Sequence, residues 1–209
     1  MDKSRDRKGF TLAELLITLI VTSILLSALS TLAFALSSAA TSESDTAVIQ
    51  AQLRQGTLRL QDLLWNCRLI CAADGAALAI WKADDNDDGE INVNELVFLD
   101  RGSGNATLKL CQFASPGNPH VTLISGALSA TKSELISGHN GTYISLIADA
   151  ENVQFTFDAA PPSTQWITTS FDLSQNGVTH HYQIDTALRA WAGHLLNDAG
   201  DTLIGDDDE

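Results

Sequence analysis

An apolar run near the start of the chain constrains its fold more than any other feature. Residues 10–36 are predominantly hydrophobic, and the only charged side chain among them is Glu14. About 20 apolar residues are enough for a helix to cross a bilayer. A carboxylate inside such a helix costs roughly 2.5 kcal/mol or more, so it indicates a function and requires a partner.

Two simpler interpretations explain only part of this pattern. A secretory signal peptide would use the basic leader and a cleavage site at residues 33–35, but its apolar region has about 7 to 15 residues. A plain membrane anchor fits the length, and the basic leader would keep the N-terminus cytoplasmic. Neither interpretation explains the junction of Gly9 with Phe10, or the carboxylate of Glu14.

The segment Lys8-Gly9-Phe10-Thr11-Leu12-Ala13-Glu14 closely resembles the start of type IV prepilins and pseudopilins. The resemblance implies that a prepilin peptidase cleaves after Gly9 on the cytoplasmic side and methylates the amine of Phe10. It also implies that Glu14, the fifth mature residue, compensates a Phe10 ammonium during filament assembly. That pairing would give the carboxylate the partner that its position requires.

The rest of the chain predicts an α+β fold, in which a long N-terminal helix packs on an antiparallel β-sheet head, as in pilins. No proline occurs before Cys71, and apolar residues recur at steps of three and four from Ile49 to Ile70. We expect a helix that weakens at the small polar residues 37–45. The predicted parts are a leader at 1–9, a transmembrane and assembly helix at 10–36, its periplasmic continuation at 37–71, a β-rich head at 72–196 and an acidic tail at 197–209.

Short runs of β-forming residues beyond Ala72 predict the strands of the head. They cover residues 76–82, 95–100, 107–113, 152–157, 165–173 and 178–184. Asn176-Gly177 separates the last two runs and is a strong hairpin signal. The Gly-, Ser- and Pro-rich residues 115–141 predict irregular structure. The last third of the chain also resembles minor pseudopilins of type II secretion and related minor pilins.

The charge of the chain is strongly acidic and argues against one class of partner. The formal net charge is −14, and residues 1–9 carry four basic and two acidic side chains, so cleavage after Gly9 would change it to −16. Nucleic-acid-binding proteins have a basic patch or stripe, whereas the only basic cluster here lies in the leader. We therefore expect no contact with nucleic acid.

Three cysteines, Cys67, Cys71 and Cys111, fall in the part predicted to lie outside the inner membrane. That compartment is oxidising in many bacteria, which favours one disulfide and one free thiol. Either Cys71 or Cys67 could pair with Cys111. The spacing of Cys67 and Cys71 also suits a metal pair, but the five histidines supply no matching zinc spacing.

An acidic stretch at residues 84–95 matches the twelve-position calcium loop of EF-hand proteins. Gly89 holds the sixth position, where such a loop turns sharply, and Ile91 holds the apolar eighth position. The predicted Ca²⁺ ligands are Asp84, Asn86, Asp88, Glu90 through its carbonyl, Asn92 and Glu95 through both carboxylate oxygens. The flanking residues look like strands and not like helices, so we expect a structural Ca²⁺, with a solvated hairpin tip as the alternative.

These features together predict a structural subunit and not an enzyme. The resemblance implies a minor pilin or pseudopilin of a type IV pilus or type II secretion pseudopilus, with prepilin peptidase, other subunits and the inner membrane as its partners. It also implies a single-pass topology with a periplasmic head. The alternative is a membrane-anchored periplasmic enzyme or ligand-binding module, but no nucleophile-elbow motif accompanies the serines or the pair His180-His181.

Overall fold

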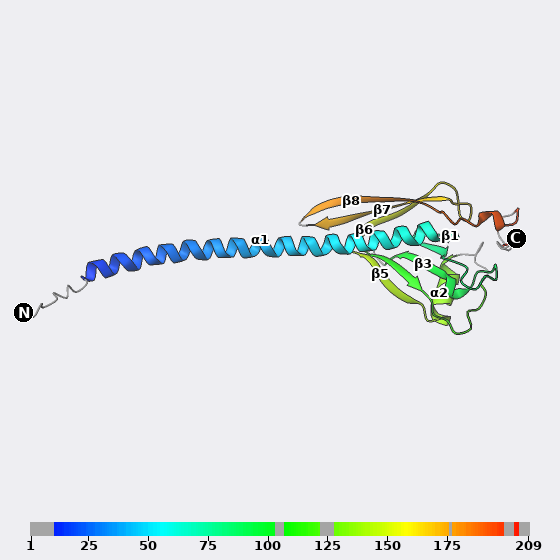
Figure 1. Ribbon diagram of the computed structural model, residues 1–209, viewed down its shortest axis with the longest axis horizontal. Coiled ribbons are helices and arrows are strands. Elements are labelled where there is room, and N and C mark those ends of the chain that lie inside the picture. The colour runs from blue at the N-terminus through cyan, green and yellow to red at the C-terminus, as the bar shows by residue number, and fades with distance from the viewer. Residues whose placement is uncertain (1–10, 103–106, 122–127, 176, 199–202, 205–209) are drawn as a thin grey trace, which may run out of the picture. The chain divides into compact units, whose positions relative to one another are not determined.

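The structure, a computed structural model, describes residues 11–102, 107–121, 128–175, 177–198 and 203–204. The chain divides into two compact units, Met1–Ile49 and Gln50–Glu209. Helix α1, Leu12–Asn66, begins in the first unit and ends in the second (Figure 1).

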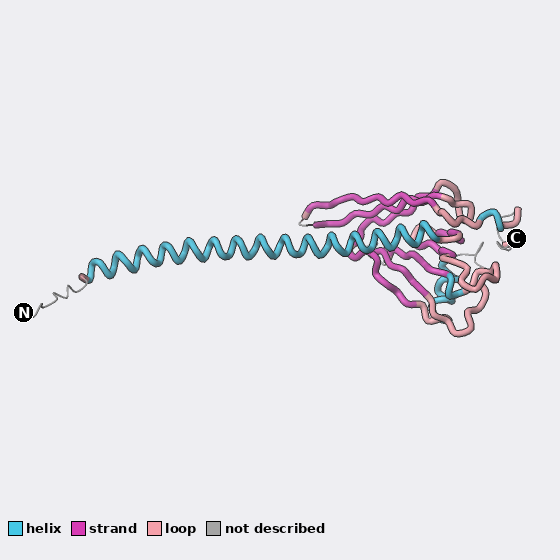
Figure 2. The backbone as a smooth tube through the Cα atoms, viewed as in Figure 1, coloured by secondary structure: helices cyan, strands magenta, loops and turns pink. Residues whose placement is uncertain are grey.

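The second unit contains two antiparallel sheets and a short helix (Figure 2). A five-stranded sheet has the order β1-β2-β3-β4-β5, and a three-stranded sheet has the order β6-β7-β8. The strands are β1 Leu69–Ala73, β2 Ala77–Trp81, β3 Leu96–Arg101, β4 Thr107–Gln112, β5 Thr142–Ala148, β6 Ala150–Phe157, β7 Trp166–Gln175 and β8 Val178–Ala187. The helix α2 is Leu128–Gly138, and the 3₁₀ turns η1 and η3 are Val93–Glu95 and Gly193–Leu195.

The predicted α+β class is confirmed, because a long N-terminal helix is followed by antiparallel sheets. All six predicted strands are present, with ends shifted by a few residues. Strands β7 and β8 pair from Trp166 with Ala187 to Gln175 with Val178, so the hairpin joins them at the predicted place in the sequence. Asn176 itself lies outside the described residues. Gly177 has a φ of 77°, a value that favours glycine in such turns.

The end of the long helix differs from the prediction. α1 ends at Asn66 instead of continuing to residue 71, and β1 begins at Leu69. Ile70 packs in one core cluster whereas Leu69 and Cys71 pack in another, so the side chains alternate with the period of a strand. Pairing with β2 therefore overrides the helical spacing at this point.

Residues 115–141 also differ from the irregular segment that was predicted. They contain α2, whose Leu128 and Leu135 are buried on one side of the five-stranded sheet. These two residues lie seven positions apart, which is two helical turns, but the glycines and serines around them hide the period. Strand β5 follows α2 and was not predicted either.

Two hydrophobic clusters form the core of the second unit. The first joins Leu60 and Leu64 of α1 to apolar residues of both sheets, including Ile80 and Phe171. The second lies on the opposite face of the five-stranded sheet and is covered by α2 and the segment around η3. Gly56 lets α1 approach β5 closely, since a Cβ there would overlap the carbonyl oxygen of Leu146.

Candidate functional site: the start of α1 and the acidic loop

The first turn of α1 is closed by reciprocal hydrogen bonds between Thr11 and Glu14. The backbone N–H and the hydroxyl of Thr11 donate to Oε2 of Glu14, at 3.0 and 2.9 Å. The N–H of Glu14 donates to the Thr11 hydroxyl at 3.3 Å. This capping box satisfies N–H groups that a helix leaves free at its start. The sequence signal, Thr-x-x-Glu before an apolar run, was present but was not used in the prediction.

The surface of the helix that follows is apolar and suits a hydrocarbon environment. Residues Leu12–Ala40 form a stretch of 29 residues with a mean hydropathy of 2.3, long and apolar enough to cross a bilayer. Its large apolar side chains are exposed. The hydroxyls of Thr18, Thr22, Ser23 and Thr31 donate to carbonyl oxygens three or four residues earlier. These polar groups therefore need no water, as a hydrocarbon environment requires.

The predicted cleavage and methylation residues, Gly9 and Phe10, lie outside the described residues. The described helix starts two residues after Phe10. Glu14 therefore lies one helical turn from the predicted mature N-terminus along the sequence.

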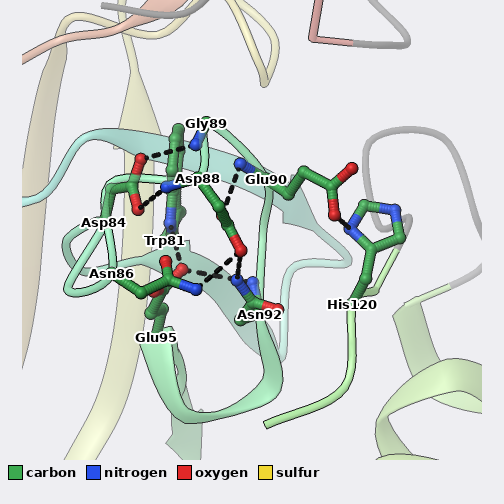
Figure 3. Close-up of polar contacts among 9 residues, drawn as sticks. All are labelled: Trp81, Asp84, Asn86, Asp88, Gly89, Glu90, Asn92, Glu95 and His120. Carbon is green, nitrogen blue, oxygen red and sulfur yellow. Dashed lines mark hydrogen bonds and ion pairs between the residues drawn. The ribbon is translucent and has the colours of Figure 1, made fainter. Parts of the chain in front are cut away.

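The acidic loop connects β2 to β3 and is folded around Asp84 (Figure 3). Its carboxylate accepts the N–H of Asp88 at 3.2 Å and the N–H of Gly89 at 3.0 Å. Asp87 and Gly89 have φ values of 52° and 69°, in the left-handed region that permits a sharp turn. The turn at Gly89 is thus located where the calcium-loop pattern placed it.

Glu95 lies at the base of this loop and is fully buried. Its Oε2 accepts the indole N–H of Trp81 and the N–H of Asn92, each at 3.2 Å, and its Oε1 accepts the N–H of Asp85 at 3.0 Å. Burial raises the pKa of Glu95, and the nearby Asp84 adds to this effect while the N–H donors oppose it. The side chain therefore connects the two ends of the loop.

The middle of the loop is a network around Asp88. Its carboxylate accepts the side-chain amides of Asn86 at 2.6 Å and Asn92 at 2.8 Å, together with the N–H of Glu90 at 2.8 Å. The carboxylate of Glu90 points elsewhere and pairs with His120 at 3.2 Å (Figure 3). The loop thus brings together the side chains of five predicted ligands, while Glu90 was expected to contribute only its carbonyl.

No group of three or more His, Cys, Asp or Glu side chains that could hold a metal is found in the described part of the chain. The loop oxygens are engaged by N–H donors instead, which include three at Glu95. The structure leaves the calcium prediction untested.

A second segment, residues 115–121, holds the exit of the acidic loop and was not found from the sequence. The amide of Asn94 donates to the carbonyl of Ser115 at 3.1 Å and its Oδ1 accepts the N–H of Ser115. The N–H of Asn94 donates to Asn118 at 2.9 Å, and backbone bonds join Val93 to Pro119. Residues so far apart in sequence meet only through the fold, so no local pattern could have indicated them.

The three cysteines are buried and free. Burial raises the pKa of Cys67 and of Cys71 to about 12 and also raises the pKa of Cys111. The suggested bridge from Cys71 to Cys111 does not suit this fold: β1 and β4 are separated by two strands, or about 14 Å at the usual strand spacing. A disulfide needs Cα atoms within about 7 Å. Cys67 packs in the other cluster, away from Cys111.

Two histidines make contacts of the kind found in catalytic sites. His181 lies 2.7 Å from Asp172, which also accepts the amide of Asn152 at 2.8 Å. His139 lies 2.9 Å from the hydroxyl of Ser115, which belongs to the segment that holds the acidic loop. These are two separate pairs, and each connects neighbouring elements of the fold.

Comparison with known proteins bears on the start of the chain. Residues 4–30 match the model of the prokaryotic N-terminal methylation motif. The chain carries the prepilin-type signature. The matched residues include Gly9, Phe10, the capping pair of Thr11 and Glu14, and more than half of the apolar stretch. No curated protein and no solved structure matches the chain.

Proposed function

We propose that this chain is a minor pilin or minor pseudopilin, a structural subunit of a type IV pilus or type II secretion pseudopilus. The observation that carries the proposal is the methylation motif at residues 4–30, which overlaps the apolar stretch Leu12–Ala40, where Glu14 is the single charged residue. In this proposal the head is periplasmic and the N-terminus cytoplasmic before assembly. Prepilin peptidase, other subunits and the inner membrane are the partners.

Assembly would follow from the chemistry of the mature N-terminus. Cleavage after Gly9 creates an ammonium at Phe10, close in sequence to Glu14. Inside a filament both charges lie away from water, so each gains most from an opposite charge. The helix can leave the bilayer for the filament because helix neighbours replace lipid around its apolar side chains.

N-terminal sequencing of the chain purified from its own cells tests this proposal. We expect a mature protein that begins with methylated Phe10, and a Gly9→Val variant that stays uncleaved and remains in the membrane. A mature chain beginning at Leu36, after residues 33–35, would show a cleaved signal peptide and refute the proposal. An uncleaved wild-type chain would instead support a membrane-anchored enzyme or ligand-binding module.

We also propose that the acidic loop binds a structural Ca²⁺ through oxygens of Asp84, Asn86, Asp88, Glu90, Asn92 and Glu95. Three observations support this: the twelve-position pattern, the sharp turn at Gly89, and the burial of Glu95 at the loop base. Ca²⁺ would supply positive charge among carboxylates that repel one another. The N–H groups on Glu95 would then give way to the cation.

A further inference from the structure

Two adjoining cavities lie between α1 and the edge strand β5. They measure about 310 and 250 Å³. Arg59 and Leu146 line both, so the cavities together form one groove along the second half of α1. We name it the β5 groove.

The β5 groove combines a free strand edge with an apolar floor. β5 is the last strand of the sheet and pairs with β4, so among the described residues the N–H and C=O groups on its other edge have no strand partner. Leu63, Leu110 and Ile144 line the larger cavity. Ile144 is 38% exposed, so part of its apolar side chain is available to a covering surface.

The charge of the groove differs from that of the chain. The chain has a formal charge of −14, yet Arg59 and Lys82 both line the larger cavity. Arg59 is exposed and makes no hydrogen bond or ion pair with any residue that the structure describes. Lys82 lies 3.4 Å from Asp85, and the carboxylate of Asp62, which also lines the cavity, accepts the amide of Asn66 at 2.8 Å. The guanidinium is thus left available to an outside carboxylate.

We propose that the β5 groove docks an extended, carboxylate-bearing segment of a different subunit in the same filament. An Asp or Glu of that segment pairs with Arg59, which can bind both carboxylate oxygens at once, and approaches Lys82. A neighbouring apolar side chain covers Ile144, and the backbone of the segment lies along the edge of β5. The proposal rests on the proposed function, since the partner is taken from the filament.

The net charge decides between a different subunit and a second copy of this chain. Two cleaved copies would bring −16 each to the interface, because the formal charge of −14 loses four basic and two acidic side chains with residues 1–9, and their overall repulsion opposes association. A less acidic subunit with one local acidic segment meets the two basic side chains without this repulsion. Because both basic groups are solvent-accessible, the contact should weaken as salt is raised.

Site-specific photo-cross-linking tests the docking in the full chain, expressed with its filament partners. Gln112 is exposed, lines the larger cavity and is replaced by p-benzoylphenylalanine. We expect a cross-link to a peptide of another subunit that contains Asp or Glu. The double variant Arg59→Glu, Lys82→Glu should lower the cross-linked fraction about fivefold or more, as expected when two attractive pairs become repulsive.

The matched control is Arg54→Glu, which makes the same change on an exposed arginine of α1 that lines neither cavity of the groove. It should leave the cross-link unchanged, whereas Arg59→Lys should retain most of it. Equal loss in Arg54→Glu, a cross-link to a second copy or to lipid, or no cross-link at all would overturn the docking proposal.

Cleavage after Gly9 and recovery in sheared filaments are measured in parallel. A chain that is cleaved and recovered but not cross-linked refutes only the docking, and an uncleaved chain refutes the proposed function.

Discussion

Glu14 and Glu95 make the same local contact in two very different surroundings. Each is the third residue after a polar residue that precedes a helical turn, and each accepts the N–H of that residue, Thr11 at 3.0 Å and Asn92 at 3.2 Å. Glu95 is fully buried and also accepts N–H groups from Trp81 and Asp85. Glu14 is exposed on an apolar helix, and among the described residues its carboxylate accepts hydrogen bonds from Thr11 alone.

The difference shows what a local motif does and does not determine. A capping glutamate satisfies the start of a helix wherever it occurs. In the head the fold supplies the remaining donors, so Glu95 has hydrogen-bond partners within the chain. In the apolar stretch Leu12–Ala40 the described residues include no basic side chain, so the charge partner of Glu14 has to come from elsewhere once water is excluded. In the proposed function that partner is the Phe10 ammonium of the same or a neighbouring subunit.

The largest expected effect is on filament assembly, which should depend on Glu14 and its charge. Replacing Glu14 with Leu removes the charge that needs an outside partner, so membrane insertion should be unchanged. Recovery in sheared filaments or cross-linked pseudopilus complexes should fall by at least about tenfold. A tenfold change corresponds to about 1.4 kcal/mol, and losing an ion pair that is shielded from water costs more than this. Glu14→Asp is the matched control, because it keeps the charge on a shorter side chain. Undiminished recovery of Glu14→Leu would show that Glu14 has no partner in the filament.

The second effect is on the stability of the head, which should depend on Glu95. Glu95→Ala leaves the buried N–H groups of Trp81 and Asn92 and the partly buried N–H of Asp85 without an acceptor, so the free energy of unfolding of the head should fall by about 3 kcal/mol. Urea unfolding followed by tryptophan fluorescence measures it. Glu90→Ala, in the same loop but exposed, should cost less than about 1 kcal/mol. Similar losses in both variants would contradict the structural role given to Glu95.

Local patterns predicted the elements that depend on local chemistry. The apolar run, the hairpin between β7 and β8 and the six strands of alternating or continuous apolar residues could be predicted, because periodicity and turn signals depend on neighbouring residues. The prediction was wrong at residues 67–71, where a helical spacing coincides with a strand that exists because β2 lies beside it. The helix α2 was missed because its apolar residues are few.

The candidate site shows the same division. The twelve-position pattern located the turn at Gly89 from sequence alone. Neither the indole of Trp81 on Glu95 nor the segment around Ser115 that binds Asn94 could be found this way, since both contacts cross long stretches of sequence. The suggested pairing of Cys71 with Cys111 does not suit the fold for a related reason. The distance between them depends on the order of strands in the sheet, which cannot be predicted from the spacing of the cysteines in the sequence.

A third prediction tests whether the surroundings of Glu95 include a cation. If Ca²⁺ binds the folded loop, Ca²⁺ at about 100 times its Kd should stabilise the chain by about 2.7 kcal/mol relative to chelator. Thermal unfolding of the detergent-solubilised chain with chelator, Ca²⁺ or Mg²⁺ measures the shift. Mg²⁺ should have a much smaller effect because it requires tight octahedral geometry. Glu95→Gln should remove most of the Ca²⁺ response. An equal response in this variant, or no response in the wild type, would show that the loop is a solvated hairpin tip and not a Ca²⁺ site.

The smallest expected effect concerns Asp172, a partly buried carboxylate that, like Glu95, accepts hydrogen bonds from other parts of the fold. Hydrogen bonds from Asn152 and His181 lower the pKa of Asp172. A carboxylate whose pKa is lower in the folded state stabilises the fold above its ordinary pKa, and this contribution is lost as the pH falls through the folded-state value. Unfolding by urea at a series of pH values from 6 downwards should therefore show a smaller acid-dependent loss of stability for Asp172→Asn than for the wild type. Asn152→Ala should give an intermediate slope, because it removes one of the two donors. Identical slopes for all three proteins would show that exposure to water cancels the effect of these hydrogen bonds, and burial would then be what distinguishes a stabilising carboxylate such as Glu95.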